Sequence, residues 1–216
     1  MISANKNFTQ KVISWYLKNK RPLPFRKSKD PYKIWLSEIM LQQTQVKTVL
    51  PYYKRWIKKF PTLKTVSLSN IDRLLKLWEG LGYYKRCINF YKASKIVIND
   101  YNGKIPDRKK EFLALPGVGE YTASAVLSIA FSKPFPVLDG NVKRVMSRII
   151  GLKKLSNFNL RKINKNLELL ICKSRPGDFN QGLMEIGALI CRPINPKCDE
   201  CPISEKCYAL KKGNPE

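Results

Sequence analysis

Four cysteines near the C-terminus constrain this chain more than any other feature of its sequence. They have the spacing C-x6-C-x2-C-x5-C, at Cys191, Cys198, Cys201 and Cys207, in 216 residues without a histidine. Four thiolates can hold a [4Fe-4S] cluster or a zinc ion, and cysteines can also pair as disulfides. Structural zinc sites usually collect their ligands as two Cys-x-x-Cys pairs, and only Cys198 and Cys201 form one. The spacing therefore favours the cluster, with zinc and disulfides as alternatives.

The opening residues MISANKNFTQKVISWYLKNKR give no sign of secretion. They lack an uninterrupted apolar core before a small-residue cleavage site. We therefore expect an intracellular protein, where disulfides are the least favoured use of the cysteines. Cys87 and Cys172 lie outside the array, in apolar helical patterns, and are expected to be small buried hydrophobic residues.

The charge of the chain predicts a polyanionic partner. Lys plus Arg number 41 against 16 Asp plus Glu, a formal net charge of +25. No stretch approaches the roughly 18 to 20 apolar residues of a membrane-spanning helix, and the basic residues are scattered along the chain between Trp and Tyr. Many lysines can simply solvate helix faces. We nevertheless expect duplex nucleic acid as the partner, and a monomeric, cytoplasmic, nucleoid-associated protein.

Apolar residues recur at helical spacing nearly throughout, and no run shows sustained strand alternation between hairpin turns. The sequence therefore predicts an all-α fold, with Gly80 and Gly103 where C-terminal caps belong. Helices are expected around Phe8 to Tyr16, from Pro31 through Met40, and over Val46 to Phe60 (bent or broken at Pro51), Ile71 to Trp78, Tyr83 to Tyr101, Lys109 to Leu115, Tyr121 to Phe131, Asn141 to Ile150, Leu160 to Lys173 and Phe179 to Cys191.

The string Leu115-Pro116-Gly117-Val118-Gly119 lies between two of these helices. Gly117 and Gly119 permit a tight hairpin whose backbone N–H groups converge at the positive start of the next helix. A plain helix–turn–helix corner is the alternative. In a strongly basic chain the string favours a helix-hairpin-helix that binds a DNA phosphate without reading sequence.

With these strings the chain resembles the helix-hairpin-helix DNA glycosylases of the endonuclease III superfamily, and within it the adenine DNA glycosylase (MutY) family. The resemblance covers residues from about 22 to 207, including the hairpin and the cysteines; its other strings are PYKIWLSEIMLQQTQV from Pro31, GLGYY from Gly80 and LDGNVKR from Leu138. It implies a two-lobed fold with the substrate cleft between a helical barrel lobe, 28–138, and a terminal lobe, 1–27 plus 139–216, that holds the cluster. The implied activity is excision of adenine mispaired with 8-oxoguanine or guanine in base excision repair.

Glu38 is the first predicted catalytic residue. On a helix it shares a face with Ile34, Trp35 and Leu41, so it is partly desolvated. Desolvation raises a carboxyl pKa toward the range that suits a general acid, which here protonates the departing adenine, most usefully at N7. A glutamate that reaches water from the edge of the apolar stripe is the alternative.

Asp139 supplies a second carboxyl. By composition alone it is an N-cap aspartate, but the resemblance implies that it stabilises the cation-like sugar, with Asn141 orienting water or Asp139. Two carboxyls in different protonation states follow the general logic of glycoside cleavage.

Tyr121 discriminates between reaction types, because related enzymes that also cut the strand carry a Schiff-base lysine at this position. We therefore expect a monofunctional glycosylase that leaves an abasic site. Lys143 could give weak lyase activity, although a phosphate contact is the favoured reading.

The resemblance also implies residues that contact the DNA bases. Gln43 and Tyr83 resemble wedge residues that enter the duplex near the extruded base, and Thr44 and Leu81 resemble residues that touch 8-oxoguanine. Arg26 and Glu185 match positions that line the adenine pocket, with Phe25 in place of a common tryptophan. As bare residue types, Tyr83, Tyr84 and Glu185 would be helix-start aromatics and an exposed acid.

One departure is larger. Most family members continue into a further domain that recognises 8-oxoguanine, and this sequence ends at Glu216, so weaker discrimination is expected. A thymine or uracil mismatch glycosylase of the same fold and a non-catalytic DNA-binding iron–sulfur module are the alternative functions.

Overall fold

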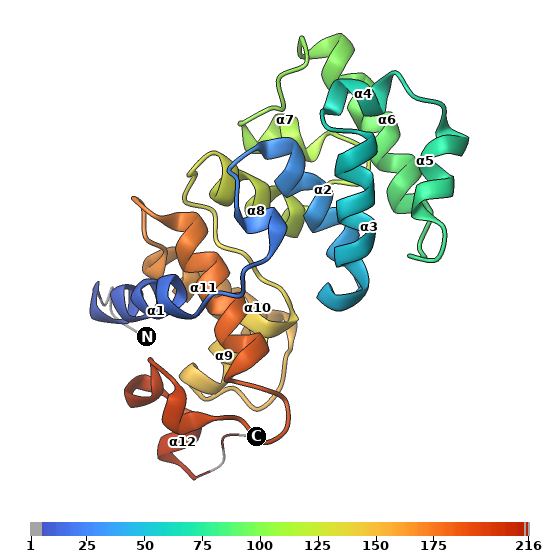
Figure 1. Ribbon diagram of the computed structural model, residues 1–216. Coiled ribbons are helices and arrows are strands. Elements are labelled where there is room, and N and C mark those ends of the chain that lie inside the picture. Colours follow the sequence, from blue (N-terminus) through green and yellow to red (C-terminus); the bar gives the residue numbers. More distant parts are fainter. Residues whose placement is uncertain (1–5, 214, 216) are drawn as a thin grey trace. The chain divides into compact units, whose positions relative to one another are not determined.

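Helices make up the regular structure of the chain (Figure 1). The computed structural model describes residues 6–213 and 215; residues 1–5, 214 and 216 of the predicted terminal lobe lie outside the described part. The described residues contain no β-strand, which confirms the all-α prediction. The α-helices are α1 (Lys6–Asn19), α2 (Pro31–Leu41), α3 (Val46–Lys59), α4 (Leu63–Ser67), α5 (Ile71–Trp78), α6 (Lys85–Asp100), α7 (Lys109–Leu113), α8 (Glu120–Ala130), α9 (Gly140–Ile150), α10 (Asn157–Leu170), α11 (Pro176–Leu189) and α12 (Tyr208–Lys211), and the 3-10 helices are η1 (Pro24–Arg26), η2 (Cys198–Glu200) and η3 (Ser204–Lys206).

Contacts divide the chain into two units. The middle unit is Pro22–Phe131, and the terminal unit combines the residues up to Arg21 with those from Ser132 onward. The lobes 28–138 and 1–27 plus 139–216 stay a prediction.

Helix α2 lies at the centre of the middle unit, in contact with α3, α6 and α8. It begins sharply, because Pro31 takes its first position and the Asp30 side chain accepts a hydrogen bond from Tyr32 N–H at 2.9 Å. Trp35 is fully buried, with its ring edge-on to Phe90 at 4.9 Å between centroids. Residues 34–40 are all buried, so a polar side chain on α2 is removed from water.

Helices α7 and α8 form the predicted hairpin. Gly117 has a φ of +79°, and a Cβ there would lie 2.8 Å from the Cβ of Asn89 on α6. Only glycine adopts this backbone and fits this space without strain. Lys109 and Glu120, at the first residues of the two helices, form an ion pair of 2.7 Å, which holds the two starts together.

In the terminal unit, α11 packs between α1 and α9, and α10 and α12 also contact α9 (Figure 1). Helices α9 and α11 approach closely where Gly187 lies against Asn141, because a Cβ on Gly187 would come within 2.6 Å of the Asn141 Cβ. The start of α9 is thereby fixed on α11.

The structure differs from the sequence prediction at Pro51 and in two short helices. Helix α3 is not broken at Pro51, because it runs continuously from Val46 to Lys59 and its buried residues Val49, Tyr53 and Trp56 hold it on the core. Helices α4 and α12 were not predicted; α4 is only five residues long and starts at a capping box between Thr62 and Thr65.

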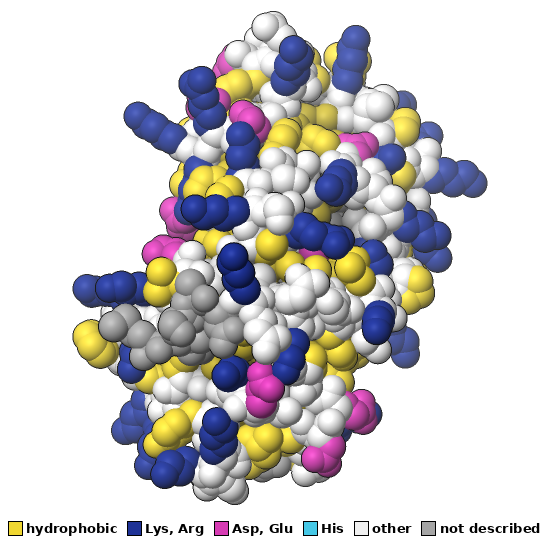
Figure 2. Space-filling model, turned by 90° about the vertical axis from the view of Figure 1, so that its left-hand side faces the viewer, with side chains coloured by type: hydrophobic (Ala, Val, Ile, Leu, Met, Phe, Trp, Pro, Cys, Tyr) yellow, Lys and Arg dark blue, Asp and Glu magenta, His cyan; other side chains and the backbone are white. Residues whose placement is uncertain are grey.

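Lys and Arg side chains stand all over the face drawn in Figure 2, with few acids among them. Within the described residues, no helix is long and apolar enough to cross a membrane.

Candidate active site

Glu38 lies on α2 with only 7% of its surface exposed. Its Oε2 accepts a hydrogen bond of 2.8 Å from the hydroxyl of Tyr121, which stands in the first turn of α8. Helix packing therefore brings two of the predicted catalytic residues together. The predicted burial of Glu38 is confirmed, whereas the pKa shift expected from it stays a prediction.

A second bond ties the same two helices. Gln42, just past the end of α2, donates from Nε2 to the Thr122 hydroxyl at 3.1 Å. Tyr121 and Thr122 are neighbours, so the pair of bonds fixes the start of α8 against the end of α2. Gln42 was not predicted as a site residue, because a single glutamine at the end of a helix carries no distinctive signal by itself.

Asp139 is the N-cap of α9, and both of its oxygens are engaged. Oδ1 accepts from Val142 N–H at 2.7 Å, and Oδ2 accepts from the Asn141 amide at 3.2 Å. The N-cap interpretation is thus correct as a statement about local structure. The two bonds fix the orientation of the carboxyl group at the start of α9.

Asn141 links Asp139 to the cysteine segment. The Asn141 Oδ1 accepts a bond of 2.9 Å from Arg144 Nη2, and Arg144 Nε donates to the Cys191 carbonyl at 2.8 Å. Arg144 Nη2 also donates to the Gly187 carbonyl at 2.7 Å. The carboxylate at the start of α9 is therefore connected through two side chains to the first cysteine.

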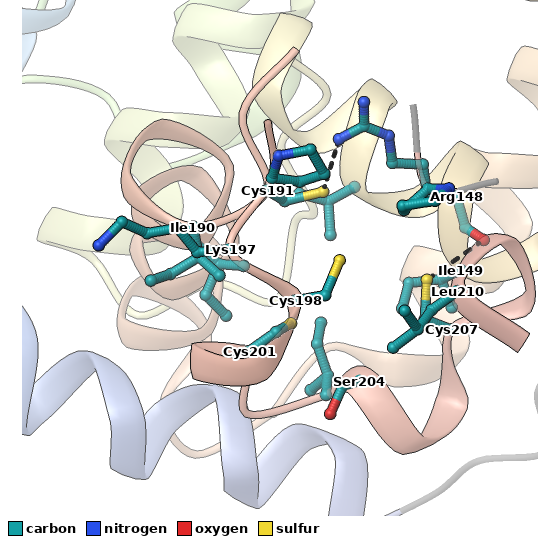
Figure 3. A pocket seen from close by; sticks show the side chains of 15 residues that line it. Arg148, Ile149, Ile190, Cys191, Lys197, Cys198, Cys201, Ser204, Cys207 and Leu210 are labelled. Atoms are coloured by element: carbon teal, nitrogen blue, oxygen red, sulfur yellow. Dashed lines mark hydrogen bonds between the residues drawn. The ribbon is translucent and has the colours of Figure 1, made fainter. Parts of the chain in front are cut away.

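The four cysteines surround one pocket (Figure 3). Arg148 on α9 donates from Nη1 to the Cys191 sulfur at 3.3 Å. A positive charge therefore lies next to a sulfur that would bind a metal group as a thiolate. Burial raises the pKa of the Cys201 thiol to about 11, so binding of a metal group there releases a proton. All four cysteines are free thiols. Cys87 is buried as predicted, whereas the predicted burial of Cys172 is wrong, because this residue lies past the end of α10 and is half-buried.

The donor set of this pocket fits an iron–sulfur cluster. Among the described residues, no three His, Cys, Asp or Glu side chains lie close enough together to hold a single metal ion. A four-iron cluster binds each of four thiolates at a different iron, and a structural zinc also takes four thiolates. Apolar Ile149, Ile190 and Ile203 are among the other residues that line the pocket.

The predicted wedge residues occupy two loops of the middle unit. Gln43 is exposed with a φ of +56°, and Tyr83 is 59% exposed with a φ of +49°. Thr44 accepts a bond at its hydroxyl from Arg86 at 3.3 Å. Leu81 is only 5% exposed and packs inside the unit, so its predicted contact with a base stays a prediction.

Glu185 is buried, with 1% of its surface exposed, so the reading of this residue type as an exposed acid is wrong. Both carboxylate oxygens accept from the Arg21 side chain, at 2.7 and 2.8 Å, and Oε1 also accepts from Arg21 N–H at 3.1 Å. The bond to Glu185 raises the pKa of Arg21. Arg26, the other predicted pocket residue, is half-buried at the end of η1.

The remaining predicted contacts lie at helix starts. Gly119 is the N-cap of α8 and Lys143 stands in the first turn of α9. The phosphate contacts of Gly117, Gly119 and Lys143 stay predictions.

Comparison with known proteins agrees with this geometry. A family model described as "HhH-GPD superfamily base excision DNA repair protein" matches residues 36–168. The chain is 45% identical over 212 residues to an adenine DNA glycosylase of Buchnera aphidicola (from Schizaphis graminum), covering 96% of this chain and 60% of the relative. It is 40% identical to the adenine DNA glycosylase of Homo sapiens, covering 97% of this chain and 40% of that protein. The chain thus spans about 60% or less of the length of these curated relatives.

Solved structures show the same fold. A thermostable thymine-DNA glycosylase is 32% identical, with a TM-score of 0.87 and 97% of each chain covered. A trapped endonuclease III–DNA covalent intermediate with an estranged adenine is 24% identical, with a TM-score of 0.80 and 99% of each chain covered. The second likeness concerns the fold alone.

Proposed function

Because the chain belongs to the HhH-GPD superfamily of base excision DNA repair proteins, we propose that it is a monofunctional DNA glycosylase that excises adenine mispaired with 8-oxoguanine or guanine. The observation that carries the proposal is the buried Glu38 carboxyl bonded to the Tyr121 hydroxyl. A buried carboxyl next to a phenol can hold and deliver a proton, which is what departure of a purine requires. The relatives named adenine DNA glycosylase support the choice of base.

Glu38 and Asp139 take different parts in this reaction. Glu38 donates its proton to N7 of adenine. The N-glycosyl bond then breaks, the base keeps both bonding electrons, and adenine departs as a neutral molecule. Asp139 stabilises the cation-like sugar until water adds at C1′ and its released proton returns to Glu38, and Asn141 orients Asp139. The products are free adenine and an abasic site.

Tyr121 excludes the Schiff-base route at its position, because a phenol cannot form an imine with the sugar. The strand should therefore stay intact after the base has left. Lys143 remains a candidate for a phosphate contact or for weak lyase activity.

The substrate in this proposal is duplex DNA bound by a monomer at the nucleoid. The hairpin of Gly117 and Gly119 holds a phosphate, and the excess of positive charge supplies the rest of the backbone affinity. Gln43 and Tyr83 enter the duplex beside the extruded adenine, Thr44 and Leu81 meet the opposing base, and Arg26 and Glu185 line the adenine pocket. Extrusion costs a few kcal/mol and is cheapest for a mismatched base.

Cys191, Cys198, Cys201 and Cys207 hold a [4Fe-4S] cluster in this proposal. When bound, the cluster cross-links four points of one segment and thereby fixes its shape. The excision step uses only the chain's own carboxyls, amide and hydroxyl.

The proposal is tested with labelled duplexes that carry A, T or U opposite G or 8-oxoguanine, analysed with and without hot alkali. Strand breaks at adenine, and only after alkali, are the expected result. Breaks before alkali would show lyase activity and contradict the role inferred from Tyr121. Binding without any product would show a non-catalytic module.

The same assay decides the second candidate, a thymine or uracil mismatch glycosylase. The likeness to the thymine-DNA glycosylase, which covers 97% of both chains, favours this candidate. Alkali-dependent breaks at T or U, with adenine untouched, would replace the adenine proposal.

Two variants test the assigned carboxyls. Glu38→Gln removes the proton and should slow excision by on the order of a hundredfold or more. Asp139→Asn should do the same although asparagine still caps a helix, so it separates the chemical role from the N-cap role. Glu79→Gln is the matched control, because Glu79 is an exposed acid of the middle unit paired with Lys76, and it should leave the rate unchanged. Full activity of either test variant would remove that residue from the mechanism.

A further inference from the structure

Arg86, in the first turn of α6, lies between the loop that follows α2 and the loop that precedes α6. Its guanidinium donates to carbonyl oxygens in the last turn of α2 and to oxygens of both loops. Nη1 donates to the carbonyls of Ile39 (3.0 Å), Met40 (3.0 Å) and Gln42, and Nη2 donates to Thr44 Oγ1 (3.3 Å), the Leu81 carbonyl (3.4 Å) and the Gly82 carbonyl (3.1 Å). One side chain therefore ties together two loops that are about forty residues apart in the sequence.

These are the loops that carry the predicted wedge residues. Gln43 stands between two Arg86 partners, Gln42 and Thr44, and Tyr83 directly follows a third, Gly82. Gln43 and Tyr83 are also two non-glycine residues with positive φ, +56° and +49°. A left-handed conformation is unfavourable for such residues and persists where the surroundings impose it. The bonds of Arg86 on either side of Gln43 and next to Tyr83 supply that constraint.

The geometry of these contacts requires a guanidinium. Arginine offers five donors in a rigid planar fork, whereas lysine has three donors on a single nitrogen. The Arg86 carbon Cζ also lies 5.2 Å from the ring centroid of Tyr83 and 5.5 Å from that of Trp78. The cation thus contacts the Tyr83 ring as well as the backbone beside it. Burial lowers the pKa of Arg86, but a guanidinium stays charged in proteins.

We propose that Arg86 is a positioning residue that couples the two wedge loops, so that Gln43 and Tyr83 are presented together for extrusion of the target base. The assignment of a wedge role to these two residues rests on the proposed function. The coupling of the two loops through Arg86 does not, and it can be measured in the protein without DNA.

Hydrogen–deuterium exchange of the purified protein tests the coupling. In Arg86→Lys and Arg86→Gln, peptides that cover residues 41–45 and 80–84 should both exchange faster, because the Thr44 and Leu81 N–H groups are bonded within these loops. Arg55→Lys is the matched control, since Arg55 is an exposed arginine of the middle unit stacked on Tyr52 at 4.6 Å. If the exchange rate of either loop is unchanged in both Arg86 variants, the proposal is wrong.

Base extrusion is tested with 2-aminopurine in place of the target adenine, whose fluorescence rises when it leaves the stack. Arg86→Lys should lower the fluorescence gain on binding and slow excision of paired adenine by on the order of tenfold. Adenine in an unpaired position needs little extrusion, so its excision should fall much less. An equal loss on both substrates, with a lowered melting temperature, would show general destabilisation and contradict a positioning role.

The two proposals fail in different ways. If the unaltered protein releases no base from any duplex, the proposed function is wrong, while the exchange experiment still decides whether Arg86 couples the loops. A different outcome is that the unaltered protein excises adenine and that Arg86→Lys has the same hydrogen–deuterium exchange and the same 2-aminopurine fluorescence. In that case the positioning role is wrong and the proposed function stands.

Discussion

Arg86 in the middle unit and the pair Arg144 and Arg148 in the terminal unit all hold irregular backbone by donating to carbonyl groups. Arg86 reaches two separate loops with one guanidinium. Arg144 and Arg148, one turn apart on α9, share a single segment, the start of the cysteine loop at Cys191 and beyond. Two arginines thus support one cysteine loop, whereas one arginine donates to both wedge loops.

The proposed cluster is a further support of the cysteine loop, and removing it tests how much the arginines contribute alone. Cys198→Ala should abolish stoichiometric iron and lower the free energy of unfolding by about 4 kcal/mol or more, because metal binding and folding of such a segment are coupled. Iron analysis and denaturant unfolding measure both effects. Cys172→Ala, at a half-buried cysteine outside the array, should retain iron. Full iron content in Cys198→Ala, or zinc in the unaltered protein, would contradict the cluster.

Removing one arginine of the terminal pair should have a smaller effect. Arg144→Gln should lower the free energy of unfolding by about 2 kcal/mol, since it leaves the carbonyls of Cys191 and Gly187 without this donor. Denaturant unfolding with iron bound is the measurement, and Arg161→Gln at an exposed position of α10 is the control.

The double variant sharpens the comparison. If Arg144 and Arg148 support one segment, the loss in Arg144→Gln with Arg148→Gln should differ from the sum of the two single losses. Strict additivity would mean that the two arginines act on independent parts of the loop.

The hairpin is a third loop, and it is shaped by glycine rather than by an arginine. Gly117→Ala should lower the free energy of unfolding by about 1 kcal/mol or slightly more, because alanine is strained at a φ of +79° and its Cβ meets Asn89. Gly119→Ala is the control, with a φ of −100° and open space around a Cβ. Equal stability of the two variants would show that the hairpin backbone relaxes freely.

Helical spacing of apolar residues predicted the long helices and the buried face of α2 that carries Glu38. It missed α4, because five residues are too few for a periodicity to show. The Thr62 and Thr65 pair was the available signal. Pro51 does not break α3, because a proline inside a helix removes one hydrogen bond and the buried side of α3 outweighs that loss.

The sequence did not show which arginines have structural roles, because the chain has such an excess of positive charge. Arg21, Arg86 and Arg144 look like surface cations in the sequence, and their roles depend on carbonyl and carboxylate groups that tertiary packing brings from distant segments. Glu185 was misread as a bare residue type for the same reason, because its partner Arg21 is 164 residues away. The positive φ of Gln43 and Tyr83 likewise leaves no mark on composition.

The packing of α1 on α11 has a consequence for the order in which the chain matures on the ribosome. Helix α1 can pack on α11 only after residues through Leu189 have been synthesised. At ordinary elongation rates its apolar side therefore remains uncovered by α11 for on the order of 10 s. All of Pro22–Phe131 has by then emerged. The nascent middle segment can therefore collapse early while α1 remains a potential client of chaperones.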